Sequence, residues 1–592
     1  MMDERPPRDE YPRMQMKRES YVCLNGEWDF EFDFSKSGLE RGFYGNKRFS
    51  HKILVPFCPE SKLSGIEFRD FMPAVWYKRA INIAPGDLGK SALLHFGAVD
   101  YMCRVFVNGM EAGTHFGGYS SFYFDIGGYL HEGENELAVY AEDDTRSFKQ
   151  PRGKQSFAYH SRGCDYTRTT GIWQTVWLEF VSRTHIEKLR IFPDYANTAA
   201  VVFIALTGGA SGMSVYADAF YNGRPAGSAH AGANGGLSVI KLDLTERHVW
   251  NPGSPELYEL KIRLKKDDAE VDSVGSYFGL RSVTWKNGAM ALNGKPLFQR
   301  LALDQGFYPD GIYTAPSDED LARDIRLSQE LGFNGARLHQ KAFEERFLYH
   351  ADRMGYLVWG EHASWGIDYS RADALTRFLP EWLELVERDF NHPAIIGWCP
   401  FNETWDVNGC RQDDEVLRVV FRAAKAVDPT RSVIDTSGNF HVETDIYDVH
   451  DYEQDVNVFQ KRYANLKQGE IFETHPDRQK YGGQPYFISE YGGTWWNPAS
   501  AGTGDSAGES WGYGMAPKSE EEFVRRYAGL TGALLQSQAV CGFCYTQLYD
   551  VEQEQNGLYT YSREKKFSDE AYKMIKAANT QKAAVEGPGY GQ

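Results

Sequence analysis

Short runs in which apolar and polar residues alternate dominate the first part of the chain. Residues 92–96 and 104–107 are examples, and glycine turns such as Asn108-Gly109 separate the runs. Alternation with a period of two is typical of half-buried strands, and many short strands with frequent turns favour a sandwich. We therefore expect residues 1–182 to form a β-sandwich with little helix.

The same strand-like pattern continues over the next hundred residues. Residues 215–220 alternate in the same way, and a stretch rich in glycine and alanine at 226–236 predicts a hairpin or a loose loop. About 100 residues of this pattern are typical of a sandwich of immunoglobulin-like size. Residues 183–283 are therefore expected to form a second, smaller sandwich.

From about residue 284 apolar runs of strand length alternate with longer helical patterns, which indicates a parallel sheet with helical crossovers. Ser317 is positioned to cap the first of these helices, with Asp318 and Glu319 in its first turn. The predicted strands cover residues 297–303, 335–338, 356–361, 394–401, 432–435, 446–450, 486–490 and 542–546. Eight strands in about 300 residues predict a (β/α)₈ barrel over residues 284–592.

Two glutamates stand at the ends of apolar strands of this barrel. Glu403 follows the fourth predicted strand and Glu490 ends the seventh. In such barrels the chemistry lies at the C-terminal ends of the strands, so both carboxylates are expected at one rim. Two carboxylates facing one another can cleave a glycosidic bond, one as acid and the other as nucleophile. The alternative, that both are solvated surface acids, is disfavoured by the apolar run before each.

The loops that follow the sixth and seventh predicted strands, at about 451–484 and 491–517, are long, and loops of that length tend to be functional. The second loop carries four aromatic residues, namely Trp495, Trp496, Trp511 and Tyr513. Flat rings with polar edges suit the face of a sugar, but they also pack loops. Both interpretations stay open for these residues.

Composition narrows the range of partners. Of the 592 residues, 42% are hydrophobic and 25% charged, and the net charge of -18 disfavours nucleic acid and anionic membrane as partners. No run approaches the roughly 20 apolar residues of a membrane-spanning helix. Residues 1–19 lack the apolar core of a signal peptide, so we expect a cytoplasmic protein.

The cysteines fit the same compartment. Eight cysteines scattered along the chain are typical of a reduced compartment, and Cys541 and Cys544 are interpreted as buried structural thiols.

Several local motifs make the chain similar to glycoside hydrolase family 2, which includes β-galactosidases, β-glucuronidases and β-mannosidases. The resemblance covers nearly the whole chain and implies a jelly-roll sandwich, an immunoglobulin-like sandwich and a TIM barrel, in that order. The matching segments are Leu24-Asn25-Gly26-Glu27-Trp28, Phe106-Val107-Asn108-Gly109, Thr170-Gly171-Ile172-Trp173-Gln174, Asn391-His392-Pro393, Asn402-Glu403 and Ser489-Glu490-Tyr491-Gly492.

The resemblance implies a role for each glutamate and for two neighbours. Glu403 would be the general acid/base, with a pKa raised by apolar surroundings and a nearby carboxylate, and Glu490 the ionised nucleophile. Asn402 would bond the sugar 2-hydroxyl, a contact that strengthens in the transition state. Arg337, at the end of the second strand, would lie beneath the nucleophile, and a simple ion-pair role for it is compatible with that.

Two further positions carry over by resemblance. Asp165, just before Thr170-Gly171-Ile172-Trp173, matches the aspartate by which the first sandwich holds sugar hydroxyls, with a structural turn as the alternative. Asn556 falls where β-galactosidases place a sugar-binding asparagine. At the place of the lysine by which β-glucuronidases recognise a carboxylate, this chain has Glu554-Gln555-Asn556, which disfavours a glucuronide.

The chain also departs from the family, and these departures leave the sugar open. Polar residues at strand ends could replace the missing contacts, namely Asp304, Gln305, His339, His450, Tyr452 and Tyr545, together with Trp495. Family metal ligands are not recognisable at residues 361–365, so neither a metal nor a cofactor is expected.

These observations predict an exo-acting, retaining β-glycosidase that acts on a carbohydrate, with a β-galactoside as the leading substrate. Another neutral sugar, such as an arabinopyranoside, a galactofuranoside or a mannoside, is the enzymatic alternative. A carbohydrate-binding protein without catalysis is the alternative of another class, and turnover of p-nitrophenyl glycosides separates the two. Members of the family often assemble through their sandwich domains, which makes a homo-oligomer compatible with this prediction.

Overall fold

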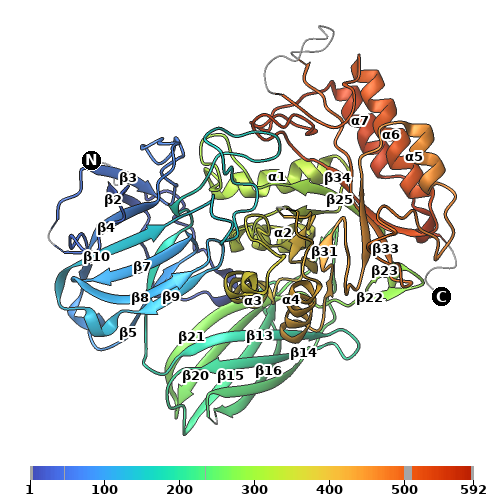
Figure 1. Ribbon diagram of the computed structural model, residues 1–592. Helices are drawn as coiled ribbons and strands as arrows, with labels where there is room; N and C mark the ends of the chain where they lie inside the picture. Colours follow the sequence, from blue (N-terminus) through green and yellow to red (C-terminus); the bar gives the residue numbers. More distant parts are fainter. Residues whose placement is uncertain (1–4, 46, 234, 408, 499–509, 588–592) are drawn as a thin grey trace.

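A computed structural model describes residues 5–45, 47–233, 235–407, 409–498 and 510–587. The chain forms two β-sandwiches followed by a parallel β-barrel with helices around it (Figure 1), as the sequence predicts. The blue strands of the first sandwich lie to the left of the barrel in Figure 1, and the green strands of the second sandwich lie beneath both.

The first sandwich has a four-stranded and a six-stranded sheet. The smaller sheet contains, in spatial order, β1 (Tyr21–Cys23), β12 (Val176–Val181), β5 (Ser91–Phe96) and β9 (Phe122–Asp125). The larger contains β3 (His51–Val55), β2 (Gly26–Phe32), β4 (Ala74–Ile83), β10 (Gly133–Glu142), β7 (Met102–Val107) and β8 (Met110–Phe116). Leu94 and Leu178 of one sheet share a buried core with Trp28 and Val139 of the other. A small pair, β6 (Val99–Asp100) with β11 (Gly171–Ile172), lies at one end.

The second sandwich packs a three-stranded sheet against a four-stranded one. The sheets contain β13 (Ile186–Asp194), β14 (Ala199–Leu206) and β17 (Leu237–Asp243), and β16 (Arg224–Ala233), β15 (Met213–Tyr221), β20 (Tyr258–Lys266) and β21 (Ala269–Phe278). Along β15 the buried residues are Val215, Ala217 and Ala219, every second position, because successive side chains of a strand point to opposite faces. The glycine- and alanine-rich stretch forms β16, one arm of a hairpin with β15.

The barrel follows a connecting region of short strands: the pair β18 (Trp250–Asn251) and β19 (Ser254–Pro255), then the antiparallel meander β22 (Val283–Lys286), β23 (Ala289–Leu292) and β24 (Lys295–Pro296). The barrel sheet is parallel and has eight strands in the order β30, β28, β27, β26, β25, β34, β33, β32. Their bounds in chain order are β25 (Gln299–Asp304), β26 (Gly335–Leu338), β27 (Leu357–Glu361), β28 (Ile395–Cys399), β30 (Ser432–Val433), β32 (Tyr447–Asp451), β33 (Tyr486–Gly492) and β34 (Val540–Thr546). Each corresponds to one of the eight predicted strands.

Helices alternate with these strands and cover the outside of the barrel. They are α1 (Asp318–Glu330), α2 (Glu345–Met354), α3 (Leu375–Asp389), α4 (Asp414–Val427), α5 (Val456–Tyr463), α6 (Glu520–Gln536) and α7 (Asp569–Asn579). The Ser317 side chain accepts a bond from Asp320 N at the start of α1, which confirms the predicted cap. Within the described part of the chain, no helix combines the length and the apolar character that crossing a membrane requires.

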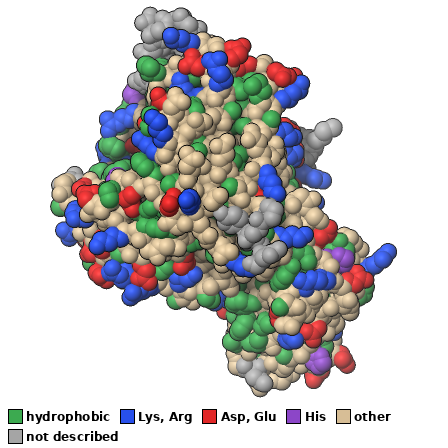
Figure 2. All heavy atoms as spheres, turned by 90° about the vertical axis from the view of Figure 1, so that its right-hand side faces the viewer, with side chains coloured by type: hydrophobic (Ala, Val, Ile, Leu, Met, Phe, Trp, Pro, Cys, Tyr) green, Lys and Arg blue, Asp and Glu red, His purple; other side chains and the backbone are tan. Residues whose placement is uncertain are grey.

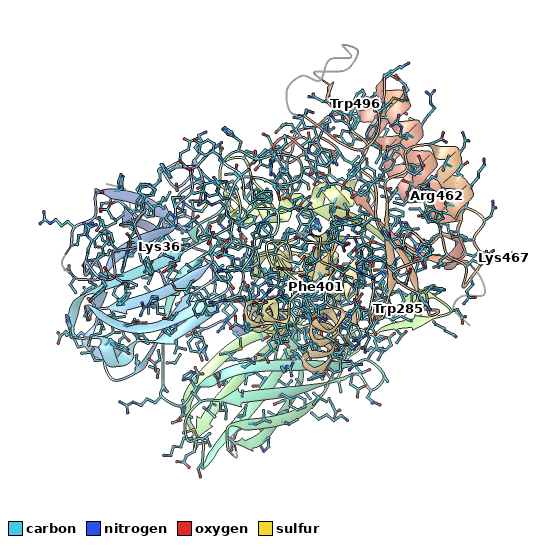
Figure 3. The ribbon with its side chains drawn as sticks, in the orientation of Figure 1. Lys36, Trp285, Phe401, Arg462, Lys467 and Trp496 are labelled. Atoms are coloured by element: carbon cyan, nitrogen blue, oxygen red, sulfur yellow. The ribbon has the colours of Figure 1, made fainter. Side chains whose placement is uncertain are left out.

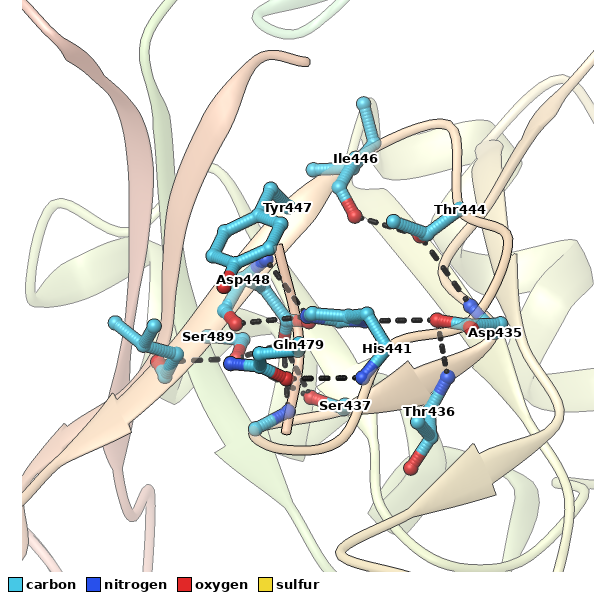
Figure 4. A network of polar contacts seen from close by, with 12 residues as sticks. Asp435, Thr436, Ser437, His441, Thr444, Ile446, Tyr447, Asp448, Gln479 and Ser489 are labelled. Carbon is cyan, nitrogen blue, oxygen red and sulfur yellow. Dashed lines mark hydrogen bonds and ion pairs between the residues drawn. The ribbon is translucent and has the colours of Figure 1, made fainter. Parts of the chain in front are cut away.

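A buried polar network closes the barrel between β30 and β32 (Figure 4). The backbone of Asp445 donates to Val433 O at 3.0 Å, and the His441 ring lies between Asp435 and Asp448. Ser437, from the short strand β31 (Thr436–Ser437), donates to Asp448 Oδ2 at 2.6 Å. These bonds replace the backbone ladder that short β30 does not provide.

A long loop between β10 and β11 carries the first sandwich onto the C-terminal ends of the barrel strands. Gly153 N donates to Trp365 O at 3.1 Å, and Trp511 Nε1 donates to Gly163 O at 2.5 Å. Gly153 has φ +56°, and a Cβ there would lie 2.4 Å from Gln340 O, so only glycine permits this approach. The loop therefore spans the barrel rim where the two glutamates were expected.

Side chains of both charge signs are interspersed on the face in Figure 2, the side of the barrel that lies to the right in Figure 1. The excess of 82 acidic over 64 basic residues is thus not gathered into one patch on this face. Such a surface offers no large field of a single sign for a polyanion.

Candidate active site

Glu403 and Glu490 point at one another across the C-terminal end of the barrel. Glu403 directly follows β29 (Phe401–Asn402), and Phe401 is labelled within the barrel in Figure 3. Glu490 belongs to β33, all seven residues of which are buried. One carboxylate oxygen of each glutamate and one ring nitrogen of His450 lie within 4.8 Å of one another.

This separation decides which displacement chemistry the pair can perform. Carboxyl groups about 5–5.5 Å apart suit direct attack on the sugar, whereas about 6.5–9.5 Å leaves room for a water on the opposite face. Oxygens within 4.8 Å of one another belong to the first arrangement. The pair can therefore form and hydrolyse a covalent glycosyl intermediate.

The backbone holds Glu403 in an unusual conformation. Its φ is 48°, in the left-handed region, where a non-glycine residue costs about 1–3 kcal/mol. A bond from Glu403 N to Ser437 O at 2.9 Å fixes this turn at the end of β29. The turn leaves the Glu403 side chain 18% exposed, while that of Glu490 is 5% exposed.

Hydrogen-bond donors surround the Glu490 carboxylate. Arg337 Nη1 donates to Glu490 Oε1 at 3.1 Å, and the Tyr452 hydroxyl donates to Oε2. Tyr513 stacks on Tyr452, with ring centroids 3.5 Å apart. Burial alone would raise the pKa of Glu490, but the charges of His450, His339 and Arg337 outweigh it and lower the pKa. Glu490 is thus ionised, as a nucleophile requires.

The pKa of Glu403 is opposite to the sequence-based expectation. His450 Nδ1 lies 2.7 Å from Glu403 Oε1. Burial would raise the pKa of Glu403, but the hydrogen bond and charge of His450, helped by Lys154, lower it to about 2. The expectation considered apolar surroundings and a second carboxylate, and it did not anticipate a bonded imidazole.

Arg337 connects the nucleophile with other residues that the sequence singled out. It donates from Nη2 to Asn402 Oδ1 at 3.1 Å and from Nε to Glu361 Oε1 at 2.6 Å. The second oxygen of Glu361 lies 3.1 Å from His339 Nδ1. The structure therefore brings five predicted residues to the catalytic pair, namely Asn402, Arg337, His339, His450 and Tyr452.

Lys154 is a site residue that the sequence analysis missed. It comes from the loop of the first sandwich, is 7% exposed, and places its ammonium 4.3 Å from the centre of the Trp365 ring. The Trp365 Nε1 in turn donates to Asn402 O at 3.0 Å. Burial would lower the pKa of Lys154, but the charges of Cys164, Glu554, Glu490 and Glu403 raise it. Within the described ranges, the ammonium has neither an ion pair nor a hydrogen bond.

Glu554 is the first residue of the triplet that led us to disfavour a glucuronide. It is 2% exposed, accepts a bond from the Tyr166 hydroxyl at Oε2, and accepts one from Asn556 Nδ2 at Oε1 at 3.0 Å. Asn556 also accepts a bond from Gln547 Nε2 at 2.8 Å. Asn556 therefore holds Glu554 in place from behind, with both ends of its amide engaged by protein.

Four of the predicted sugar contacts have bonds to, or pack against, other protein groups. Asp304 accepts bonds from the Tyr549 hydroxyl and Gly306 N, and Tyr545 packs against Tyr491 and Tyr527 toward α6. Neighbouring residues of a strand point to opposite faces, so on β34 Cys544 faces the site instead of Tyr545. The charges of Arg337 and Glu490 act on the Cys544 thiol. The remaining two, Asp165 and Trp495, are paired with Arg152 at 2.9 Å and with Ser510 at 3.0 Å.

The aromatic residues of the loop after β33 have two roles: some pack beside the last barrel helices and others lie near the two glutamates. Trp496 is 5% exposed and packs against Phe523 and Phe567, and Figure 3 places it at the edge of the molecule beside the last helices. Tyr513 reaches the site through its stacking on Tyr452. Residues 499–509 of this loop lie outside the described residues.

Glu403, His450 and Glu490 are also the residues that could hold a metal ion, since an imidazole and two carboxylates suit several divalent metals. The same residues, however, already have bonds to one another and to Arg337. The Arg337 guanidinium lies 3.1 Å from Glu490, and His450 is bonded to Glu403. A fixed cation beside one ligand opposes a dication there.

Three family models match successive parts of the chain. Residues 22–179 match the sugar binding domain of the glycosyl hydrolases family 2, residues 184–281 match the model described as glycosyl hydrolases family 2, and residues 283–509 match the TIM barrel domain of that family. Together the three models cover most of the sequence.

Individual relatives are distant. The chain is 26% identical over 408 residues to a β-galactosidase of Thermoanaerobacter pseudethanolicus, a match that covers 65% of this chain and 50% of that one. It is 25% identical over 480 residues to a β-glucuronidase of Felis catus, which covers 73% and 71%. A solved structure of a β-glucuronidase from Ruminococcus gnavus shares the fold with a TM-score of 0.78 and 19% identity, over 97% of this chain and 100% of that one.

Proposed function

The chain belongs to glycosyl hydrolase family 2, and we propose that it is an exo-acting, retaining β-glycosidase with Glu403 as acid/base and Glu490 as nucleophile. In the first step Glu490 attacks the anomeric carbon while Glu403 protonates the leaving oxygen. In the second, Glu403 deprotonates a water that hydrolyses the glycosyl ester. The observation that carries the proposal is the approach of the two carboxylates to within 4.8 Å.

The neighbours of the pair support these roles. Arg337 and Tyr452 keep Glu490 ionised and oriented through its two oxygens. Asn402 Oδ1 accepts from Arg337, which orients its amide NH₂ for a sugar hydroxyl. Glu403 Oε2 has a contact only to Trp405 Nε1, at 3.4 Å, among the described residues, so it is available to the leaving group.

An exo mode of action is supported by the loop from the first sandwich. It is held at one side of the rim by bonds to Trp365 O and at the other by Gln553, whose Nε2 donates to Gly163 O and Asp165 O at 2.7 and 3.0 Å. The loop thus crosses the barrel end near the catalytic pair. A barrier of this kind suits a terminal sugar better than the interior of a polysaccharide.

For the sugar itself we propose a neutral glycone, and a β-galactoside in particular. Four carboxyl groups, Glu361, Glu403, Glu490 and Glu554, surround three cationic side chains, Arg337, Lys154 and His450; burial raises the pKa of Glu361 to about 7 and raises that of Glu554, while the pKa values of Glu403 and Glu490 are lowered. A uronide would add another negative charge to this set. Lys154 and Glu554 then provide a donor and an acceptor for sugar hydroxyls, and the β-galactosidase relative supports the galactoside.

A second candidate, a β-glucuronide, is favoured by one observation. The Lys154 ammonium is buried and without an ion pair in the described structure, and a carboxylate is the partner that such a cation prefers. The β-glucuronidase relative supports the same candidate. We rank it second because Glu554, Glu490 and Glu403 already lie close enough to raise the pKa of Lys154, so a further carboxylate would be repelled by them.

Two accompanying proposals concern the conditions of action. We propose that no metal takes part, because the Arg337 guanidinium pairs with Glu490 and His450 is bonded to Glu403. We also propose a reduced, cytoplasmic compartment, which is supported by the eight cysteines, all of them free thiols and five of them buried.

The test is a panel of p-nitrophenyl β-glycosides, namely the galactoside, arabinopyranoside, mannoside, galactofuranoside and glucuronide. We expect turnover of a neutral glycoside with the β-anomer as first product by NMR, and loss on the order of 10⁴-fold or more for Glu490→Gln. Glu330→Gln, an exposed glutamate of α1, is the matched control. A folded protein inert on the whole panel, an α-anomer as first product, or an active Glu490→Gln variant would each refute the proposal.

A further inference from the structure

We propose that His450 is the positioning residue that holds the catalytic proton for Glu403, so that the two side chains act as one acid. The inference rests on the proposed function, because it assigns the proton that Glu403 delivers. The sequence placed His450 among the sugar contacts. The structure instead engages both of its ring nitrogens with protein, in the gap between the two catalytic carboxylates.

The hydrogen-bond pattern around the ring defines where its protons lie. Ser437 Oγ has a single proton, and its best acceptor is the Asp448 carboxylate at 2.6 Å. Ser437 Oγ therefore accepts from His450 Nε2, 3.0 Å away. With Nε2 protonated, the bond between Nδ1 and Glu403 Oε1 at 2.7 Å contains one shared proton. That proton is either on the imidazole or on the carboxyl.

The position of the ring is fixed from behind. Gly438 has φ +89°, and a Cβ built there would lie 2.4 Å from His450 Nδ1, so the ring packs directly on this backbone. The His450 side chain is 6% exposed. A ring held this tightly cannot rotate toward a sugar without losing its bonds to Glu403 and Ser437.

Several charged groups act on the ring, and together they favour its cationic form. Burial would lower the pKa of His450, but Glu490, 3.4 Å from Nε2, and Glu403 raise it, against the opposing charge of Arg337. The charge of His450 is also felt by Asp448 and by Glu361. In the resting site the proton therefore lies on His450, with Glu403 ionised.

Attack by Glu490 on the sugar favours transfer of the proton from His450 to Glu403. When Glu490 forms its bond to the sugar it loses its negative charge, and with it the largest interaction that raises the pKa of His450. The proton then moves from Nδ1 to Glu403, and Glu403 passes it to the leaving oxygen. Nucleophilic attack and proton delivery are thereby coupled through one imidazole.

The cycle balances without any additional reactant. After the first step Glu490 is an ester, Glu403 is a carboxylate and His450 is neutral, which is the state in which Glu403 can act as base. Glu403 then takes a proton from water as the hydroxide displaces Glu490. The returning Glu490 charge draws that proton back onto His450 and restores the starting state.

The test compares a phenyl and a 2,4-dinitrophenyl β-glycoside of the sugar that the panel identifies. In His450→Asn we expect kcat/KM to fall about 100-fold for the phenyl glycoside, which needs its leaving group protonated, and less than about 3-fold for the dinitrophenyl glycoside. The alkaline limb of the phenyl profile should also move to lower pH, because the proton then resides on an isolated carboxyl. Equal losses on both substrates, or an unmoved alkaline limb, would overturn the proposal.

Two further variants separate this inference from the function on which it rests. Ser437→Ala keeps His450 but removes the acceptor for Nε2, so a smaller shift of the alkaline limb in the same direction is expected, and no shift counts against the proposal. In Glu403→Ala, azide should accelerate turnover of the dinitrophenyl glycoside and give the β-glycosyl azide. If azide fails there, the acid/base assignment itself falls. If azide works while His450→Asn loses both substrates equally, only the proton-holding role falls.

Discussion

Two histidines on neighbouring segments of the barrel each lie between two carboxylates, yet their surroundings differ. His441 Nδ1 lies 2.7 Å from Asp435, and its Nε2 lies 3.1 Å from Asp448. His450 Nδ1 lies 2.7 Å from Glu403 in the same way. Each cluster thus places an imidazole between two carboxylates, with the shorter contact at 2.7 Å in both.

What separates the clusters is whether the carboxylate bonded to the histidine is accessible from outside. In the first cluster Asp435 is fully buried, and its oxygens also accept bonds from Thr436 N, Val442 N and Glu443 N. In the second, Glu403 is 18% exposed and its Oε2 has a single weak contact. We call the cluster of Asp435, His441 and Asp448 closed and the cluster of Glu403, His450 and Glu490 open. A buried carboxylate in the closed cluster can only stabilise the fold, whereas the partly exposed carboxylate of the open cluster can exchange a proton with a substrate.

The closed cluster also predicts where stability is lost. Asp435 and Asp448 come from segments on either side of the barrel seam, and the His441 cation holds them together (Figure 4). The two clusters meet at Ser437, which bonds both Asp448 and His450. A rigid, closed cluster therefore supports the open one.

The largest expected effect that distinguishes the clusters is on folding. His441→Asn should lower the free energy of unfolding by about 3–5 kcal/mol, because it leaves two buried carboxylates without their cation. The kcat of the folded fraction should change far less than the stability, because Ser437 keeps its bonds to Asp448 and His450. Urea unfolding and activity assays measure the two quantities, and a variant with normal stability and low kcat would break the comparison.

The pH dependence of that loss follows from the sign of the shift. The carboxylates raise the pKa of His441 well above its ordinary value of 6.5. A group with a raised folded pKa stabilises fully below its unfolded pKa and loses the contribution as pH rises through the folded one. The difference between wild type and variant should therefore be largest below about pH 6.5 and shrink at higher pH.

Lys154→Met tests the open cluster, and its expected effect on activity is smaller than the effect of His441→Asn on stability. The open cluster receives this cation from another domain, and its charge helps to lower the pKa of Glu403. We expect about a 10-fold loss of kcat/KM on a neutral glycoside, in the range of one lost hydrogen bond to a charged group. Lys62→Met, on the exposed surface, is the control. A loss of 100-fold or more restricted to the glucuronide would instead favour the second candidate substrate.

The smallest expected effect is that of a chelator. Both clusters contain the ligand types of a metal site, but Arg337 and His450 occupy the open one. Dialysis against EDTA should leave kcat/KM unchanged. Activity that disappears and returns with one divalent metal would show that the open cluster is a metal site.

The pattern of apolar and polar residues along the chain was sufficient to predict the barrel strands that carry the site. Every barrel strand was predicted because strands and helices have different periods, and each period is visible in a few residues. The two glutamates followed from the same pattern, since the ends of parallel strands must meet at one rim. Asn402 and Arg337 were predicted from the family resemblance, and they join the glutamates at that rim.

The chemistry of the site depended on contacts between distant segments. The strand pattern did not say that Cys544 faces inward and Tyr545 outward, because either orientation of β34 has the same period. Lys154 carries no local signal and reaches the site only because its loop docks on the barrel. The pKa of Glu403 is set by burial, a hydrogen bond and charges from distant segments, so the sequence could single out Glu403 but only the tertiary structure decided that its pKa is low.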